Sequence, residues 1–268
     1  MKTRLDVLLV EKGFFRSRTA AQSAIMEGRV KVDGVPQSKC GTVVRAESVI
    51  EVDVPPIAYV SRGGVKLEGA LKRFQIPVDG KVCLDAGSST GGFVDCLLQH
   101  GARKVFAVDV GYGQLAWSLR TDPRVVPMER TNLRYLTSKH IGERVDLVTL
   151  DLSFISLSKV WPAVQDLAKP RAEILSLVKP QFEAGRENVG KRGVVSDPGV
   201  HSKVLVGLID TAHQMGFLVK GLCESPIQGP EGNIEFWLYM LNEKEVNATD
   251  WGDVVSAVVK EAHERFKK

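Results

Sequence analysis

A chain of 268 residues, 44% hydrophobic and 25% charged, is long enough for one large α/β domain and a small additional module. A formal net charge of +4 is too small to separate a nucleic-acid-binding protein from any slightly basic enzyme. Four cysteines without Cys-x-x-Cys spacing and five histidines without ligand spacing argue against a metal site or a disulfide framework. No apolar stretch approaches the ~18 residues of a membrane span, and charges interrupt the first residues, so we expect a cytoplasmic protein with no membrane contact.

The first 58 residues predict a compact α+β module. Leu5 to Val10 form a short amphipathic helix, and Arg18 to Glu27 form a second one. An alternating segment then turns at Asp33-Gly34, which is typical of a two-residue hairpin, and Ser48 to Val54 alternates again. Two helices and a small hairpin sheet therefore form the first domain.

Basic side chains gather where the second helix of this module meets the following strand. On one face they would supply phosphate contacts to structured RNA, although solvated surface charge is the plainer interpretation. The phrase Glu-Gly-Arg-Val-Lys-Val-Asp-Gly at residues 27–34 resembles the α-L RNA-binding domain named after a small-subunit ribosomal protein. We assign RNA binding to Arg4, Arg16, Arg18, Arg29, Lys31 and, just beyond the module, Arg62.

A stiff Pro55-Pro56 connection leads to an interdomain linker at residues 59–63, and the second domain occupies residues 64–268. Alternating strands and helices in this domain predict a doubly wound α/β sheet. We expect strands at 81–85, 104–108, 124–128, 145–150, 173–178, 217–223 and 234–241, and helices at 64–74, 93–100, 200–215 and 250–266. Residues 181–198 predict a long loop that covers a cofactor or touches RNA, with surface disorder as the alternative.

Residues 84–93, Leu-Asp-Ala-Gly-Ser-Ser-Thr-Gly-Gly-Phe, predict a strand-to-helix turn. Asp85 stands at the carboxyl end of the strand, where open α/β sheets bind ligands, and Asp109 ends the next strand, placed for ribose hydroxyls. The spacing Gly-x-Gly-x-x-Gly is absent, which disfavours a dinucleotide. An acidic residue before the glycines fits a ligand with a cationic amino acid end, such as S-adenosylmethionine, whereas the plainer interpretation is a tight connection.

This turn resembles motif I of Rossmann-like methyltransferases, and its sequence is similar to that of the FtsJ-like branch, which methylates RNA 2′-hydroxyls. The resemblance implies S-adenosylmethionine as cofactor. The residues expected to bind it are Asp85, Gly87, Ser88, Ser89, Thr90, Gly91, Gly92, Phe93 and Asp109, with Glu129 and Asn132 where an adenine-contacting segment would fall.

Four charged residues interrupt or border apolar stretches of the second domain: Lys66, Asp151, Lys179 and Glu235. Buried charges must be paired, so we expect these groups to converge, with two ordinary salt bridges as the alternative. Their order resembles the catalytic tetrad of RNA 2′-O-methyltransferases. Together with the phrases Val-Ser-Arg-Gly-Gly-Val-Lys-Leu, Asp-Leu-Ser-Phe-Ile-Ser-Leu and Leu-Val-Lys-Pro-Gln-Phe-Glu, the whole chain resembles the TlyA (hemolysin A) family of ribosomal RNA methyltransferases.

That resemblance implies a Rossmann-like methyltransferase sheet, mostly parallel with an antiparallel last strand. It also implies methylation of ribose, on a cytidine, in the RNA of ribosomal subunits. A 2′-hydroxyl is a poor nucleophile and needs a base, for which Lys179 is our candidate. Lys66 would favour proton loss from Lys179 by like-charge repulsion and bind the target nucleotide. Asp151 and Glu235 would hold the two ammonium groups and would also oppose that proton loss.

Two other functions fit parts of the sequence. A Rossmann domain that has lost catalysis would leave a non-catalytic RNA-binding or ribosome-assembly factor, but all four tetrad residues are present. The hemolysin name suggests a cytolytic protein, which the lack of a membrane segment and of a signal peptide disfavours.

Overall fold

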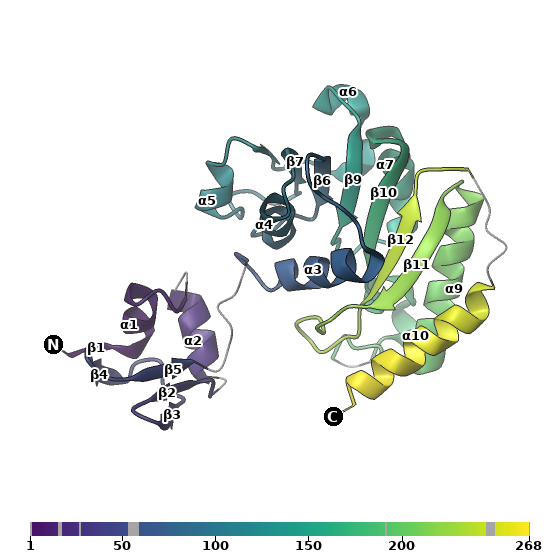
Figure 1. Cartoon of the computed structure of the whole chain (residues 1–268). Coiled ribbons are helices and arrows are strands. Elements are labelled where there is room, and N and C mark those ends of the chain that lie inside the picture. Colours follow the sequence, from purple (N-terminus) through teal and green to yellow (C-terminus); the bar gives the residue numbers. More distant parts are fainter. Residues whose placement is uncertain are drawn as a thin grey trace. The chain divides into compact units, whose positions relative to one another are not determined.

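The computed structural model describes residues 2–15, 18–26, 28–52, 59–190, 192–244 and 250–267. The chain divides into two compact units, Met1–Val60 and Ser61–Lys268 (Figure 1). The Pro55-Pro56 connection lies outside the described residues, and the domain limits of 1–58, 59–63 and 64–268 stay predictions.

The small unit combines two short helices with two small antiparallel sheets. Strands β2 and β3 join through Asp33 and Gly34, whose φ values of +51° and +78° form the left-handed pair that a two-residue hairpin requires. Leu9, Ile25 and Val30 are fully buried, so the helices and the hairpin share one core. The elements are β1 (Lys2–Arg4), α1 (Leu5–Glu11), α2 (Arg18–Met26), β2 (Val30–Val32), β3 (Val35–Gln37), β4 (Val43–Arg45) and β5 (Ile50–Val52).

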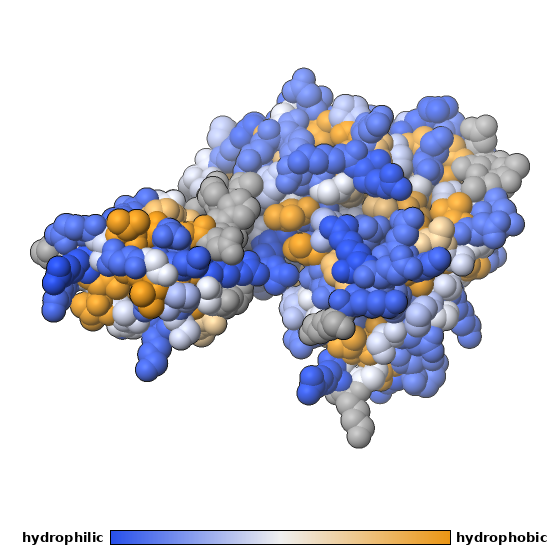
Figure 2. Space-filling model, turned by 60° about the horizontal axis from the view of Figure 1, so that its bottom comes forward, coloured by the Kyte–Doolittle hydropathy of each residue, from blue (hydrophilic) through white to orange (hydrophobic). Residues whose placement is uncertain are grey.

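The expected helices and hairpin of this unit are confirmed, whereas β1 and β4 were not predicted. These two strands pair with each other over three residues, a length at which alternation of apolar and polar residues cannot be recognised. Some apolar side chains of the unit stay exposed, namely Met26, Val35, Val43 and Val49. Figure 2 accordingly shows apolar patches between hydrophilic ones on its left part.

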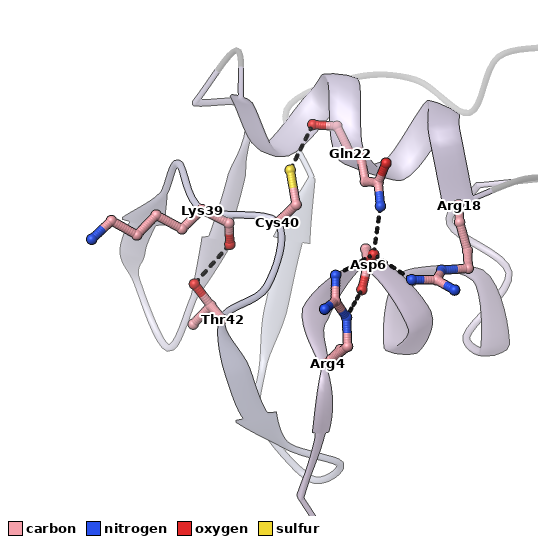
Figure 3. A network of polar contacts seen from close by, with 7 residues as sticks. All are labelled: Arg4, Asp6, Arg18, Gln22, Lys39, Cys40 and Thr42. Atoms are coloured by element: carbon pink, nitrogen blue, oxygen red, sulfur yellow. Dashed lines mark hydrogen bonds and ion pairs between the residues drawn. The ribbon is translucent and has the colours of Figure 1, made fainter.

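A fully buried carboxylate, Asp6, organises the basic side chains of the small unit (Figure 3). Arg4 donates to both Asp6 oxygens through Nε and Nη2, each at 3.0 Å. Arg18 Nη2 at 3.0 Å and Gln22 Nε2 at 2.7 Å donate to the same carboxylate. The hydrogen bonds from Arg4 hold the pKa of Asp6 far below its ordinary value, although burial opposes that shift. Arg4 and Arg18 are therefore fixed side by side on one anion.

The described residues of the large unit form a seven-stranded sheet in the order β11-β12-β10-β9-β6-β7-β8. Its strands are β6 (Val82–Ala86), β7 (Lys104–Val108), β8 (Val125–Met128), β9 (Val145–Leu150), β10 (Ala168–Val178), β11 (Leu218–Glu224) and β12 (Phe236–Leu241). Every neighbouring pair is parallel except the two pairs that involve β12, which runs antiparallel to β10 and to β11. The doubly wound, mostly parallel sheet with an antiparallel last strand is thus confirmed.

Helices cover both faces of this sheet (Figure 1). On one face, α7, α9 and α10 share a core with inward residues such as Leu84, Val148 and Ile174. On the other face, α3 packs against α4 and over β11, where Gly221 meets the ring of Phe74. The helices are α3 (Gly63–Phe74), α4 (Gly92–Gln99), α5 (Trp117–Arg120), α6 (Ser138–Ile141), α7 (Trp161–Leu167), α8 (Pro180–Glu183), α9 (Pro198–Gln214) and α10 (Trp251–Arg265).

Two expectations about this unit need correction. Strand β10 begins at Ala168 rather than at 173, because its first half contains Pro170, a left-handed Arg171 and a register shift that hide the strand pattern. The expected loop at 181–198 is partly helical, with α8 at its start and a 3-10 turn at Arg186–Asn188. In the described part of the chain, no helix combines the length and apolar character that crossing a membrane requires.

Candidate active site

Four strand ends of the large unit bring acidic and basic side chains to one edge of the sheet. Asp85 lies in β6, Asp151 follows β9, and Lys179 follows β10. These three strands are parallel, so their carboxyl ends share an edge. Glu235 directly precedes β12, and because β12 runs antiparallel, its amino end reaches the same edge. Lys66 comes to this edge from helix α3.

The first ion pair of the site joins Lys66 to Glu235 and is almost completely buried. Lys66 Nζ donates to Glu235 Oε2 at 2.6 Å, with only 9% and 1% of the two side chains exposed. Burial raises the pKa of Glu235, while the Lys66 and Lys179 charges oppose that rise. A carboxylate this buried is tolerable in its ionised form only because an ammonium group contacts it.

The second ion pair joins Lys179 to Asp151, with Nζ 2.6 Å from Oδ1 and 12% and 21% of the side chains exposed. Lys179 Nζ also donates to Ser153 Oγ at 3.1 Å. The charges of Lys179 and Asp151 both reach Glu235 and influence its protonation. The four residues therefore form two ion pairs, one buried and one partly exposed.

The glycines of the β6–α4 turn fit the close approach of neighbouring chain segments. Gly87 has φ +83°, and a Cβ there would lie 2.3 Å from the backbone oxygen of Asp151. Gly91 has φ +96° and serves as the N-cap of α4. A Cβ at Gly92 would lie 2.2 Å from Ser61 Oγ, beside the start of α3. The turn is thus closed against both the Asp151 segment and the first turn of α3.

Asp85 is 1% exposed, and only one of its two carboxyl oxygens has a hydrogen-bond partner among the described residues. Its Oδ1 accepts a hydrogen bond from Thr149 Oγ1 at 2.7 Å, whereas Oδ2 has no partner among the described residues. Burial raises the pKa of this carboxyl to about 8, and the Thr149 hydroxyl opposes the rise. An ammonium group of a ligand beside Oδ2 would favour the ionised carboxylate and supply the missing hydrogen-bond donor.

Replacing Asp85 by asparagine is expected to flatten the pH dependence of unfolding. The pKa of Asp85 rises from 3.8 to about 8 on folding, so its contribution to stability is complete below about pH 4 and is lost towards pH 8. The slope in this window approaches ~1.4 kcal/mol per pH unit, and asparagine removes it. Denaturant titrations at several pH values, followed by tryptophan fluorescence, would measure the free energy of unfolding of the large unit, because all four tryptophans lie in it. Parallel stability curves for the two proteins would contradict the prediction.

Asp85 borders a cavity of about 370 Å³. The turn contributes Gly87, Ser88, Ser89, Thr90, Gly92 and Phe93 to its wall, and Ser61, Arg62, Gly63, Lys66, Asp151, Gln228 and Pro230 complete it. Gln228 and Pro230 belong to the β11–β12 connection, which the sequence analysis did not identify as part of the site. Its run of Pro, Gly and polar residues at 225–233 was the available signal.

A second cavity, of about 740 Å³, shares Gly87, Ser89 and Asp151 with the first. Asp109 and Asn132, two of the residues predicted to bind the cofactor, line it. The Asp109 carboxylate accepts from the backbone N–H groups of Ser89 at 2.8 Å and Gly111 at 2.6 Å, so it also fixes the turn. Each oxygen retains a second lone pair for a hydroxyl donor.

Glu129 lines neither cavity. Its Oε1 accepts a hydrogen bond from the N–H of Gly113 at 2.8 Å and pairs with the Arg120 guanidinium. These contacts hold the Glu129 side chain against the loop between β7 and α5. Phe93 reaches the smaller cavity and packs on Trp237, with ring centroids 5.5 Å apart. Phe154 was not predicted as a site residue, yet it lines the larger cavity with φ +64° and 90% exposure.

The residues expected to bind RNA have different surroundings. Arg16 lies outside the described residues. Arg4 and Arg18 are 49% and 57% exposed while paired with Asp6 (Figure 3). Arg29 and Lys31 are exposed at the start of β2. Arg62, in the large unit, lines the smaller cavity and donates to the Gln228 carbonyl at 3.5 Å. Among the described residues, no cluster of histidine, cysteine or acidic side chains could hold a metal ion.

Comparison with known proteins places the chain in a family. The model of the FtsJ-like methyltransferases matches residues 59–241, and the model of the S4 domain matches residues 3–50. A Mycobacterium tuberculosis protein named 16S/23S rRNA (cytidine-2′-O)-methyltransferase TlyA is 47% identical over 263 residues, covering 97% of this chain and 98% of the relative. The chain belongs to the TlyA family of FtsJ-like methyltransferases.

Other members of the family carry varied names. A Bacillus subtilis candidate rRNA methyltransferase named YqxC is 47% identical over 270 residues, covering 100% of this chain and 96% of the relative. A solved structure of a candidate hemolysin from Streptococcus thermophilus has 41% identity and a TM-score of 0.80, covering 99% of this chain and 97% of that one. The family expected from the sequence motifs is therefore confirmed.

Proposed function

We propose that the chain transfers the methyl group of S-adenosylmethionine to the 2′-hydroxyl of a cytidine ribose in the RNA of ribosomal subunits, in the cytoplasm. The observation that carries the proposal is that Asp151 lines both cavities while pairing with Lys179. Asp151 therefore links both cavities to a lysine that could accept a proton. The name of the Mycobacterium tuberculosis relative supports ribose methylation of cytidine and ribosomal RNA as the target.

The residues present fit the cofactor. The unpartnered Oδ2 of Asp85 would accept hydrogen bonds from its ammonium group, and Asp109 would accept from its ribose hydroxyls in the larger cavity. The Gly87–Gly92 turn lines the smaller cavity, so its backbone would pass close to the amino acid end. When bound, S-adenosylmethionine supplies an electrophilic methyl group on a sulfonium sulfur.

The four charged residues Lys66, Asp151, Lys179 and Glu235 would then bind and activate the ribose that accepts the methyl group. Lys179, as the neutral amine, would take the proton of the 2′-hydroxyl as the oxygen attacks the methyl carbon. Asp151 would hold the resulting ammonium group, which it contacts at 2.6 Å. Lys66 lines the smaller cavity and would bind the target nucleotide, while Glu235 fixes its ammonium group.

The proposal is tested by incubating purified ribosomal subunits with the protein and S-adenosylmethionine labelled on the methyl group. We expect label in rRNA, with the phosphodiester bond next to the modified nucleotide resistant to alkaline cleavage. Subunit binding without label transfer would favour a non-catalytic assembly factor. A methyl group on the base would exclude ribose chemistry.

We expect the double variant Arg29→Ala/Lys31→Ala to bind subunits more weakly, and with a shallower dependence on salt, than the parent protein. Both side chains are exposed at the start of β2, and each lost phosphate contact costs about 1 kcal/mol or more. Filter binding at several salt concentrations measures both effects. Lys203→Ala in α9 of the large unit is the control for loss of a basic residue. Unchanged affinity and slope in the double variant would remove β2 from the RNA-binding surface.

A further inference from the structure

Ser153 lies two residues after Asp151 in the segment that follows β9, and it lines the larger cavity. The sequence analysis gave it no role, because it has no Gly-x-Ser-x-Gly context. In the structure, its hydroxyl oxygen accepts a hydrogen bond from Lys179 Nζ at 3.1 Å. Ser153 therefore contacts the nitrogen to which the proposed function assigns proton transfer.

The two partners of Lys179 differ in kind. Asp151 Oδ1 is 2.6 Å from Nζ, but it receives no hydrogen bond of good geometry within the described part of the chain. That pair is an attraction of charges with little directional preference. The contact with Ser153 satisfies hydrogen-bond geometry. Asp151 thus supplies the charge that holds the ammonium group, whereas Ser153 supplies the direction in which one N–H bond points.

We propose that Ser153 is a positioning residue, which orients Lys179 so that the lone pair of the neutral amine faces the ribose hydroxyl. An amine nitrogen has four tetrahedral directions, one of which is its bond to Cε. When one N–H bond points to the Ser153 oxygen and another lies towards Asp151, the remaining direction is fixed. The inference rests on the proposed function, because a fixed lone pair matters only if Lys179 accepts a proton.

Four other charged groups either lie near this nitrogen or hold the segment that carries Ser153. Asp151 follows β9, Glu235 precedes β12, and Lys66 from α3 is paired with Glu235. Glu183 on α8 accepts the backbone N–H of Leu157 at 2.9 Å and so holds the segment that carries Ser153. Replacing Ser153 leaves all four groups in place. A change in the titration of Lys179 would then report the lost hydroxyl.

The expected effect of Ser153→Ala has two parts. The turnover number should fall about tenfold, because the amine is no longer aligned. The rising limb of the pH–rate profile should move to lower pH, because an acceptor of the ammonium hydrogen bond favours the charged form and has been removed. A merely structural defect would lower the rate without moving the limb.

Matched variants make the test specific. Ser153→Thr keeps the hydroxyl and should restore both the rate and the limb. Ser158→Ala removes a hydroxyl from the same segment, one that faces Ser156 Oγ at 2.9 Å, and should behave like the parent protein. An unshifted limb in Ser153→Ala, or failure of Ser153→Thr to restore it, would overturn the proposal.

A measurement without RNA separates this inference from the proposed function. Acetylation of Lys179 by acetic anhydride at a series of pH values, read by mass spectrometry of the peptide, reports its protonation directly. We expect the same shift to lower pH in Ser153→Ala. If the acetylation curve shifts but neither protein methylates rRNA, the contact is real and the proposed function fails. If methylation occurs and the acetylation curve does not shift, only the role of Ser153 is wrong.

Discussion

Lys179→Ala is expected to lower methyl transfer to ribosomal subunits by roughly 10³-fold or more at saturating cofactor and RNA, since a positioned base contributes 10²–10⁴-fold. Subunit binding should persist, because the exposed basic residues of the small unit are untouched. Lys179→Arg should fail as well, because a guanidinium group stays protonated and cannot accept the hydroxyl proton. Single-turnover transfer of labelled methyl groups measures both variants.

Lys169→Ala is the matched control for this loss. Lys169 lies near the start of β10, whereas Lys179 follows its end, and it pairs with Asp146 at 2.6 Å. Its partner Asp146 lies near the start of β9, at the opposite end of that strand from Asp151. We expect this variant to retain normal turnover. Near-normal turnover of Lys179→Arg, or methylation of a base, would show that Lys179 is not the base.

The second large effect concerns stability. Glu235→Ala should destabilise the large unit by about 3–5 kcal/mol, because it leaves the Lys66 ammonium group buried without its partner. The double variant Lys66→Met/Glu235→Gln should recover most of this stability but no activity, since a buried ion pair can be replaced by uncharged groups of similar size. Denaturant unfolding and methyl transfer, measured on the same preparations, separate the two effects.

Helix α3 also provides the control for this experiment. Lys72 and Glu68 form an exposed pair on it at 2.6 Å, with 71% and 28% of their side chains exposed. Lys72→Ala should cost less than about 0.5 kcal/mol, because water screens an exposed pair. If Glu235→Ala and Lys72→Ala cost the same, burial of the Lys66–Glu235 pair would not contribute to stability as inferred.

The strand positions of the large unit could be predicted from sequence because buried parallel strands form short apolar runs between helical segments. The same rule placed Asp151 and Lys179 together, since both directly follow such runs. It could not predict the early start of β10, where Pro170 and Arg171 interrupt the pattern. Strands β1 and β4 are recognisable only through their pairing with each other.

Side-chain direction was the part of the site that the sequence did not determine. Glu129 and Asn132 both follow β8, yet Asn132 lines the larger cavity whereas Glu129 is paired with Arg120. Distance along the chain carries no information about such a choice, because it depends on the packing of the β7–α5 loop. For the same reason the Ser153 contact with Lys179 becomes visible only when the ends of β9 and β10 are placed side by side.

The contact between Gly87 and the backbone of Asp151 restricts how this protein can vary. A Cβ at Gly87 would lie 2.3 Å from the Asp151 oxygen, and the Asp151 N–H is bonded to the Ala86 oxygen at 2.9 Å. The Ala86–Gly87 segment, in the wall of the smaller cavity, and the segment that carries Asp151 are therefore held together by direct backbone contact. Even a single methyl group at Gly87 would have to displace the other segment. Substitutions that change the shape of the smaller cavity at this point will also change the larger cavity, which shares Gly87 and Asp151 with it. The two cavities must therefore evolve together.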